Sequence, residues 1–254
     1  MGMVVRDPER GLSVFSDRAF GDPTAGEREC AQPAPRSCWA LPARRYSNSE
    51  KLRLQDLVVG RIRAFLQAEG CSRRLVSSRE EASGAWIEAG PLDLSLAGLC
   101  DFQERLLRMV LDGLHADELG WQNAARVQRV IEADHPRFTH DEALRILRAE
   151  GLNLALGAPL SGEAEAVLVR RCGDLPVQIT YGPMEPGMFD ARLEGSHAQT
   201  IEWVEVVLPG TGTALTGVVR AEDRRVGFWK RRTICRAACR ISVARLLHYA
   251  LDGN

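Results

Sequence analysis

The chain has 254 residues, of which 45% are hydrophobic, and a formal net charge of −1 at pH 7. This length allows one large domain or two small ones, and the near-zero charge argues against a protein that coats nucleic acid. No run of about 18 apolar residues occurs, so we expect no membrane-spanning helix. We expect no secretory signal, because the first residues lack an apolar core, and the seven cysteines form no Cys-x-x-Cys pair. Both observations predict a reduced, cytoplasmic protein.

The first 48 residues show neither a strand period nor a helix period. Turn-forming residues occur from Arg6 to Gly11, and four prolines follow between residues 23 and 42. We predict a loosely ordered arm over residues 1–48 and a folded domain over residues 49–254.

The pattern changes at Ser49, where apolar residues begin to fall on one helical face. An amphipathic helix is predicted from Lys51 to Gly70, either packed on the core or forming a dimer interface. Short strands are predicted at Leu75–Val76 and over residues 92–96. Helices are predicted over residues 102–114 and 121–131.

The stretch from residue 134 to residue 220 has the clearest local signals. Thr139 and Glu142 form a capping box that starts a helix, and Gly151 is placed to end it. A second helix is predicted near Glu163, and strands are predicted over residues 177–181, 201–208 and 217–220. Helices mixed with closely spaced strands favour an α+β domain built on an antiparallel or mixed sheet.

Arginines are interleaved with apolar residues after Arg220, which predicts one long helix or two short ones that close the domain. A solvated cationic face is the first interpretation of these arginines, and RNA contact is the second. Cys235 and Cys239 would lie one helical turn apart, but two soft ligands without a matching pair are usually packing residues. We therefore predict no metal site formed by cysteines.

Several of these segments carry a family likeness. Residues 135–147 resemble the Pro-Arg-Ile-Thr-Tyr-x-Glu-Ala segment of class II aminoacyl-tRNA synthetases of the asparaginyl and aspartyl branch. Gly157, Leu160, Glu163 and Glu165 resemble the segment that follows it, and residues 167–181 and 204–222 continue the likeness in order. Arg79-Glu80-Glu81 resembles the start of motif 2, and the helix from Lys51 to Gly70 is similar to the dimer helix of motif 1. The likeness covers about residues 49–250 and implies a reduced antiparallel sheet flanked by helices.

The sequence departs from this family in ways that bear on activity. The family's glutamate after the Pro-Gly turn aligns with Thr213, and the segment between motifs 1 and 2 is nearly absent. We expect the domain to lack motif 3, a Gly-rich strand and helix with an ATP-binding arginine, and also the anticodon-binding domain. Adenylate formation depends on charges placed around the triphosphate. A degenerate, truncated paralogue that does not perform ordinary tRNA charging is therefore expected.

Four residues are the candidate binding site. By the resemblance, Arg220 contacts the substrate amino acid, Glu205 is an acidic site residue, Arg79 holds an α-phosphate and Glu81 holds an amine. Each has a simpler interpretation: Arg220 could begin a solvated basic helix, Arg79 and Glu81 could form a surface ion pair, and Glu205 could face outward from its strand. We predict that Arg79, Glu205 and Arg220 meet at one cavity.

The function predicted from these residues is binding of a small amino acid or its activated form, an adenylate or an aminoacyl-tRNA. Amide or peptide bond formation in specialised metabolism would be consistent with it. The alternatives are a non-catalytic dimeric scaffold that binds tRNA or a protein partner, and an ATP-dependent ligase resembling asparagine synthetase. The resemblance implies ATP and magnesium as cofactors, no catalytic residue is assigned, and a homodimer through the Lys51 to Gly70 helix is expected.

Overall fold

The computed structural model describes residues 4–7, 11–14, 46–71, 73–76, 86–114, 119–155, 157–183, 200–220 and 236–251. The chain forms two compact units, Met1–Arg45 and Tyr46–Asn254. In the first unit, β1 (Val4–Asp7) and β2 (Gly11–Val14) pair antiparallel. The turn residues predicted after Arg6 thus lie between two strands that the sequence did not predict. Arg79, Glu81 and most of the basic segment after Arg220 lie outside the described residues.

The second unit contains one seven-stranded sheet. Its strand order is β3-β4-β9-β8-β7-β6-β5, and every neighbouring pair is antiparallel except β5 with β6. This confirms the predicted α+β class with a mostly antiparallel sheet. The strands are β3 (Arg73–Val76), β4 (Trp86–Asp93), β5 (Arg137–Thr139), β6 (Val177–Thr180), β7 (Trp203–Leu208), β8 (Gly212–Arg220) and β9 (Arg236–Ser242).

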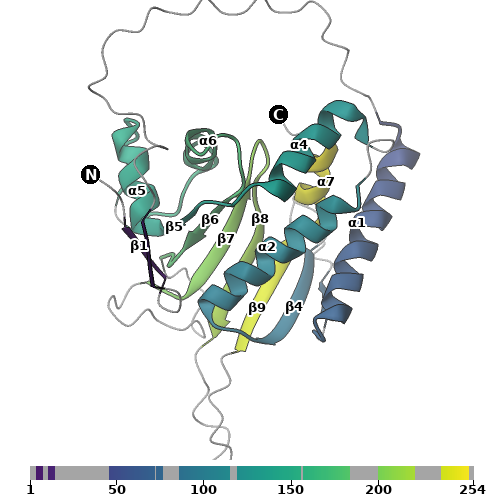
Figure 1. The fold of residues 1–254 in the computed structure, drawn as a ribbon, viewed down its shortest axis with the longest axis horizontal. Helices are drawn as coiled ribbons and strands as arrows, with labels where there is room; N and C mark the ends of the chain where they lie inside the picture. The colour runs from purple at the N-terminus through teal and green to yellow at the C-terminus, as the bar shows by residue number, and fades with distance from the viewer. Residues whose placement is uncertain are drawn as a thin grey trace, which may run out of the picture. The chain divides into compact units, whose positions relative to one another are not determined.

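Six described helices pack around this sheet (Figure 1). They are α1 (Asn48–Ala68), α2 (Leu96–Asp112), α4 (Trp121–Glu132), α5 (His140–Ala149), α6 (Gly162–Arg171) and α7 (Val243–Leu251). The predicted capping box of Thr139 and Glu142 is present at α5, and Ser47 and Glu50 form another at α1. No described helix is both long enough and apolar enough to span a bilayer.

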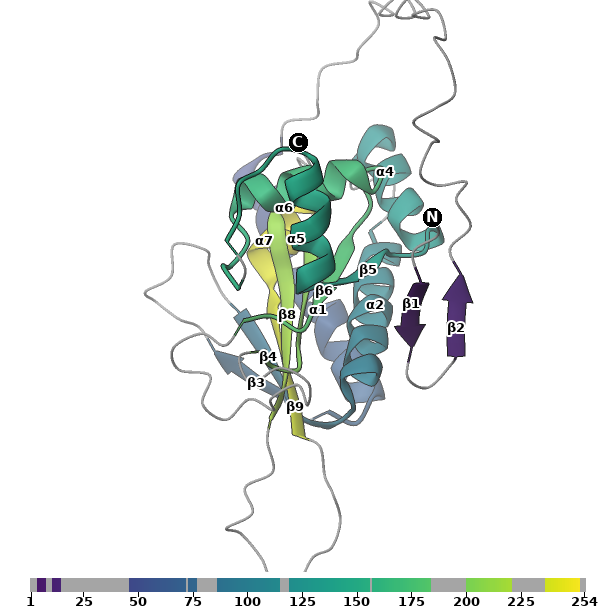
Figure 2. The ribbon, with the colours of Figure 1, turned by 90° about the vertical axis from the view of Figure 1, so that its left-hand side faces the viewer.

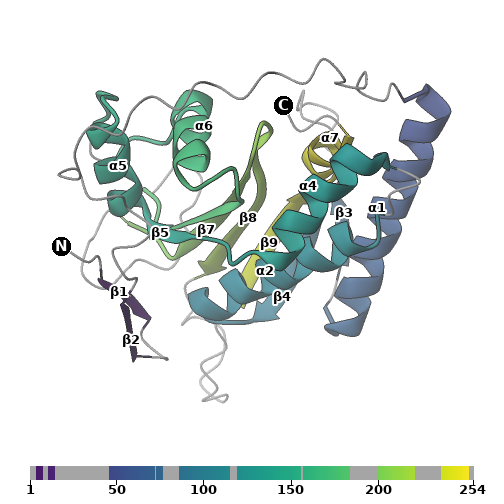
Figure 3. The ribbon, with the colours of Figure 1, turned by 45° about the horizontal axis from the view of Figure 1, so that its top comes forward.

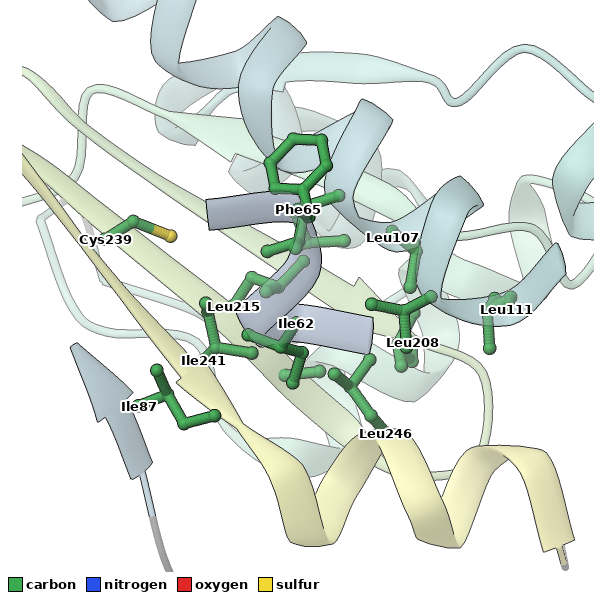
Figure 4. Packing of buried hydrophobic residues seen from close by; sticks show 14 of the residues in the cluster. Ile62, Phe65, Ile87, Leu107, Leu111, Leu208, Leu215, Cys239, Ile241 and Leu246 are labelled. Atoms are coloured by element: carbon green, nitrogen blue, oxygen red, sulfur yellow. The ribbon is translucent and has the colours of Figure 1, made fainter. Parts of the chain in front are cut away.

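One face of the sheet is buried by α1, α2 and α7, which pack on β4, β9, β8 and β7 (Figures 3 and 4). The buried side chains of α1 recur every three or four residues, as one helical face requires. They are Leu54, Val58, Ile62, Phe65 and Leu66. Strand alternation supplies the facing side chains, including Leu215 and Ile241. Alternate residues of these strands must therefore lie on the opposite face of the sheet.

Helices α5 and α6 pack on the β5, β6 and β7 part of the sheet and on the start of β8 (Figure 2). Arg137 in β5 joins this part to α2. Its Nη2 atom donates to Oδ1 of Asp101 at 2.7 Å and to Oε2 of Glu104 at 2.8 Å. This pairing fixes the short edge strand against α2.

Two predictions of secondary structure were wrong. The strand predicted over residues 92–96 is instead β4, which ends at Asp93, while Leu96 begins α2. β4 includes Pro91 because the register with β9 shifts between Ala89 and Leu92, and a proline is tolerated at such a bulge.

The second error concerns the first part of the segment after Arg220, whereas the helix predicted to close the domain is present as α7. Residues 236–242 form the strand β9, which pairs with both β4 and β8. Cys239 is therefore on a strand rather than one helical turn from Cys235, whose position lies outside the described residues. Tertiary pairing on both sides determines the conformation here, although the arginines give the segment no clear strand period.

Gly217 provides a test of how closely α2 packs on the sheet. A Cβ added at Gly217 would lie 2.7 Å from Cδ2 of the fully buried Leu99 and 3.0 Å from Nε2 of Gln103. We expect Gly217→Ala to lower the free energy of unfolding by about 1–3 kcal/mol, measured by chemical denaturation.

Gly60 is the matched control, because it lies in the middle of α1 and an added Cβ would have no atom within 4 Å. Gly60→Ala should stabilise the protein by about 0.5–1 kcal/mol. Equal effects of the two substitutions would contradict the described packing of α2.

Candidate functional site

A row of polar residues crosses four strands on the face opposite α1 and α2. Glu88 in β4 is paired with Arg240 in β9, Arg240 with Thr216 in β8, and Thr216 with Glu205 in β7. Directly opposite residues in antiparallel strands point to the same face. We call Glu88, Arg240, Thr216 and Glu205 the polar row. It places two acids and one base side by side on a sheet whose other face is apolar.

The charged residues of the polar row differ in burial. Arg240 is exposed, Glu88 is half-buried and Glu205 is only 8% exposed. Among the described residues, neither the guanidinium of Arg240 nor the carboxylate of Glu88 has a hydrogen-bond or ion-pair partner. A cation and an anion therefore face the same surface on neighbouring strands, with groups available for a ligand.

Glu205 is held by Thr213, which lies earlier on β8. Oγ1 of Thr213 is 3.1 Å from Oε2 of Glu205. Thr213 and Thr216 can share a face only because the β7–β8 register shifts, so that Val206 pairs with Leu215 and Val207 with Thr213. The bulge adds one residue and restores the alternation.

Glu165 of α6 reaches the same hydroxyl. Its Oε1 atom is 3.0 Å from Oγ1 of Thr213. A Cβ added at Gly212 would lie 2.8 Å from Oε2 of Glu165 and 2.6 Å from Nη1 of Arg245. Burial raises the pKa of Glu165, opposed by the contact with Thr213 and by the positive charge of Arg245.

Arg245 lies in the first turn of α7, directly after β9. Its Nη1 atom donates to the carbonyl oxygen of Thr211 at 2.7 Å, in the turn between β7 and β8. The arginine thus joins the last helix of the described chain to the hairpin that holds Glu205.

If this site holds magnesium, a nucleotide would have to supply most of the oxygen ligands. No cluster of three or more His, Cys, Asp or Glu side chains occurs in the described residues. Magnesium nucleotides need fewer protein ligands, because one or two carboxylates suffice when phosphates complete the shell. Glu165 and Glu205 would supply those carboxylates and Arg245 a phosphate contact. A magnesium ion held in this way would neutralise negative charge on the phosphates.

Of the predicted site residues, Glu205 and Arg220 lie in the part of the chain that the structure describes. Glu205 is in a strand and faces a polar partner, as a buried carboxylate requires. Arg220 is the last residue of β8 rather than the first residue of a helix. The simpler interpretation, in which Arg220 begins a solvated basic helix, was therefore wrong. Strand alternation puts position 220 on the face of Thr216, four residues and roughly 13 Å further along β8. Convergence of Arg79, Glu205 and Arg220 at one cavity stays a prediction.

Sequence reasoning missed three polar residues of this site. Arg240 was assigned to a helix, so its place in the row could not be seen. Glu165 was explained by the favourable charge at a helix start, although it also contacts Thr213. Arg245 was counted among solvated cations. Apolar residues at every second position, Ala237, Cys239 and Ile241, are the one weak sequence signal for β9.

Comparison with known proteins supports the likeness found in the sequence. No protein-family model matches the chain. Mouse asparaginyl-tRNA synthetase is 30% identical over 106 residues, which cover 40% of this chain and 22% of the synthetase. The human enzyme is 28% identical over 102 residues, covering 38% and 21%. The match to each curated relative therefore spans about a fifth of its length.

The fold agrees over a larger part of the chain. Asparaginyl-tRNA synthetase from Pyrococcus horikoshii has a TM-score of 0.67 at 16% identity, covering 80% of this chain and 64% of the synthetase. The Entamoeba histolytica enzyme in complex with asparaginyl-adenylate has a TM-score of 0.61 at 15% identity, covering 80% and 63%. The chain has the fold of a class II aminoacyl-tRNA synthetase catalytic domain. Among the relatives compared, asparaginyl-tRNA synthetases match it in both sequence and structure.

Arg245 and Arg240 should differ in their effect on stability. We expect Arg245→Met to lower the free energy of unfolding by about 1–3 kcal/mol, because the charged hydrogen bond to the Thr211 carbonyl is lost. Arg240→Met should change it by less than about 0.5 kcal/mol, because its guanidinium is exposed. Chemical denaturation of both variants measures the difference, and equal losses would contradict the assigned contacts.

Proposed function

We propose that the polar face, which is the side of the sheet that carries the polar row, binds a small amino acid or its activated form, an aminoacyl adenylate or aminoacyl-tRNA. The observation that carries this proposal is the cross-strand pair of Glu88 and Arg240. An amino acid carries an ammonium and a carboxylate on one carbon, and neighbouring strands lie about 4.8 Å apart. Glu88 suits the ammonium and Arg240 suits the carboxylate, or the phosphate of an adenylate.

Arg220, Arg79 and Glu81 complete the proposed site. Position 220 lies on the polar face, where a guanidinium could contact the side-chain carboxylate or amide of the ligand. Arg79 and Glu81 would serve the phosphate and the amine, as the resemblance implies. Two asparaginyl-tRNA synthetases of the same fold are known in complex with asparaginyl-adenylate, which favours aspartate or asparagine as the first ligands to test.

A bound adenylate would also define the class of reaction. Its acyl carbon is activated because the adenylate group can leave with the electron pair of the broken bond. Attack by an amine would then form an amide and release AMP. We therefore propose acyl transfer to an amine as the reaction class, with Arg245 near the leaving phosphate.

Arg240→Gln tests the binding site directly. Titration calorimetry with aspartate, asparagine and non-hydrolysable adenylate analogues should show affinity reduced about 10–100-fold, because a charged hydrogen bond is lost. Arg220→Ala should weaken the same ligands. The control is Arg63→Gln on the exposed side of α1, which should bind as wild type does. Absence of binding by wild type, or equal affinity of wild type and Arg240→Gln, would contradict the proposal.

The alternatives differ from this proposal in what they bind. A non-catalytic scaffold for tRNA or a protein partner is motivated by the basic segment after Arg220. Salt-dependent retention of tRNA by a protein that binds no amino acid would favour it. An ATP-dependent ligase resembling asparagine synthetase requires ATP–pyrophosphate exchange, which a binding protein would not show.

The proposed homodimer through α1 has little apolar surface available. The apolar side of α1 packs inside its own chain, and Leu52, at 62% exposure, is the one large exposed hydrophobic side chain among the described residues. A dimer through this helix would depend on Leu52 and the polar outer side. Leu52→Glu should then shift the protein towards monomer in sedimentation velocity, by at least about tenfold in dissociation constant. An unchanged dimer would place the interface elsewhere.

A further inference from the structure

Three apolar side chains lie next to the polar row on the same face of the sheet. Trp203 in β7 is paired with Val218 in β8, and Val218 is paired with Ala238 in β9. Each lies two residues along its strand from a member of the polar row. Strand alternation therefore puts all three on the polar face, about 7 Å from that row. We call Trp203, Val218 and Ala238 the apolar strip.

The two flanks of the polar row differ in how far a ligand can reach them. The three side chains of the apolar strip are each half-buried. In the other direction along the strands, Val207 in β7 and Ser242 in β9 are only 1% and 0% exposed. A ligand held by Glu88 and Arg240 can therefore extend over the apolar strip, whereas Val207 and Ser242 offer it almost no surface.

The indole of Trp203 is constrained by a close fit to Gly182. A Cβ added at Gly182 would lie 2.4 Å from Cε3 of the indole, so the ring occupies the space of a side chain at this position. Tyr181 turns the chain here with a φ of 58°, and its backbone N–H donates to the carbonyl oxygen of Trp203. An aromatic side chain that is already held in place loses little conformational entropy when a ligand packs on it.

We infer that the site takes an amino acid with an apolar side chain, which packs on the apolar strip while Glu88 and Arg240 hold the ammonium and the carboxylate. This inference rests on the proposed amino-acid binding and names the class of side chain. An amide or carboxylate over the strip would lose water without gaining a hydrogen bond from Val218 or Ala238. A hydrocarbon side chain is favoured there, because contact with the strip removes apolar surface from water on both partners.

Leucine and asparagine test this directly, because their side chains have the same branched shape and differ in polarity. Titration calorimetry of the wild-type chain should show leucine bound at least about tenfold more tightly than asparagine or aspartate. Val218→Thr keeps the shape of the side chain and adds a hydroxyl to the strip, so it should reduce the preference for leucine over asparagine by about 3–10-fold. Val59→Thr, at a half-buried position of α1, is the matched control and should leave the preference unchanged.

Trp203→Leu is a second variant, because it keeps an apolar side chain and removes the indole. It should weaken the binding of leucine by about fivefold or more and that of asparagine by less than about twofold. A wild-type preference for asparagine or aspartate, or a preference for leucine that neither variant changes, would overturn this inference and leave amino-acid binding in place. Absence of binding by all three amino acids would contradict the proposed function as well.

Discussion

The two-sided character of the sheet determines the rest of the structure. In β4, β9, β8 and β7, alternate side chains enter an apolar core against α1, α2 and α7. The intervening positions lie on the opposite face, where the polar row crosses the strands. Burial of one face thus determines the register, since a slip of one residue would exchange the two faces. The charged residues of these strands share one face because the apolar residues of the same strands are packed on the other face.

The bulge in β8 adapts this pattern to the candidate site. Without it, Thr213 and Thr216 would lie on opposite faces, and Glu205 would lose the hydroxyl that contacts it. The extra residue is accommodated because Ala214 and Leu215 are both buried. The hairpin is then joined to α7 through Arg245 and to α6 through Glu165. Elements distant in sequence, α6 and α7, therefore meet at the β7–β8 hairpin that holds Glu205.

Local signals in the sequence were sufficient for much of this fold. The capping box at Thr139 and the apolar period of α1 depend on neighbouring residues, so the sequence predicted both helices. β9 depends on pairing with β4 and β8, which no local window contains, and its arginines were therefore assigned to a helix. The same limit applies to the site. Glu205 was predicted from the resemblance, whereas the position of Arg240 and the contact of Glu165 with Thr213 became visible only through cross-strand and helix contacts. The resemblance to class II synthetases gave the sheet architecture correctly.

The central claim is that ligands bind to the polar face, between β4 and β7. Backbone amide chemical shifts during titration with an asparaginyl-adenylate analogue test it most directly, since they locate binding without any substitution. The account predicts saturable shifts around Glu88, Arg240 and Thr216, with small changes along the outer side of α1. Shifts confined to α1, or no saturable shift at any position, would contradict it.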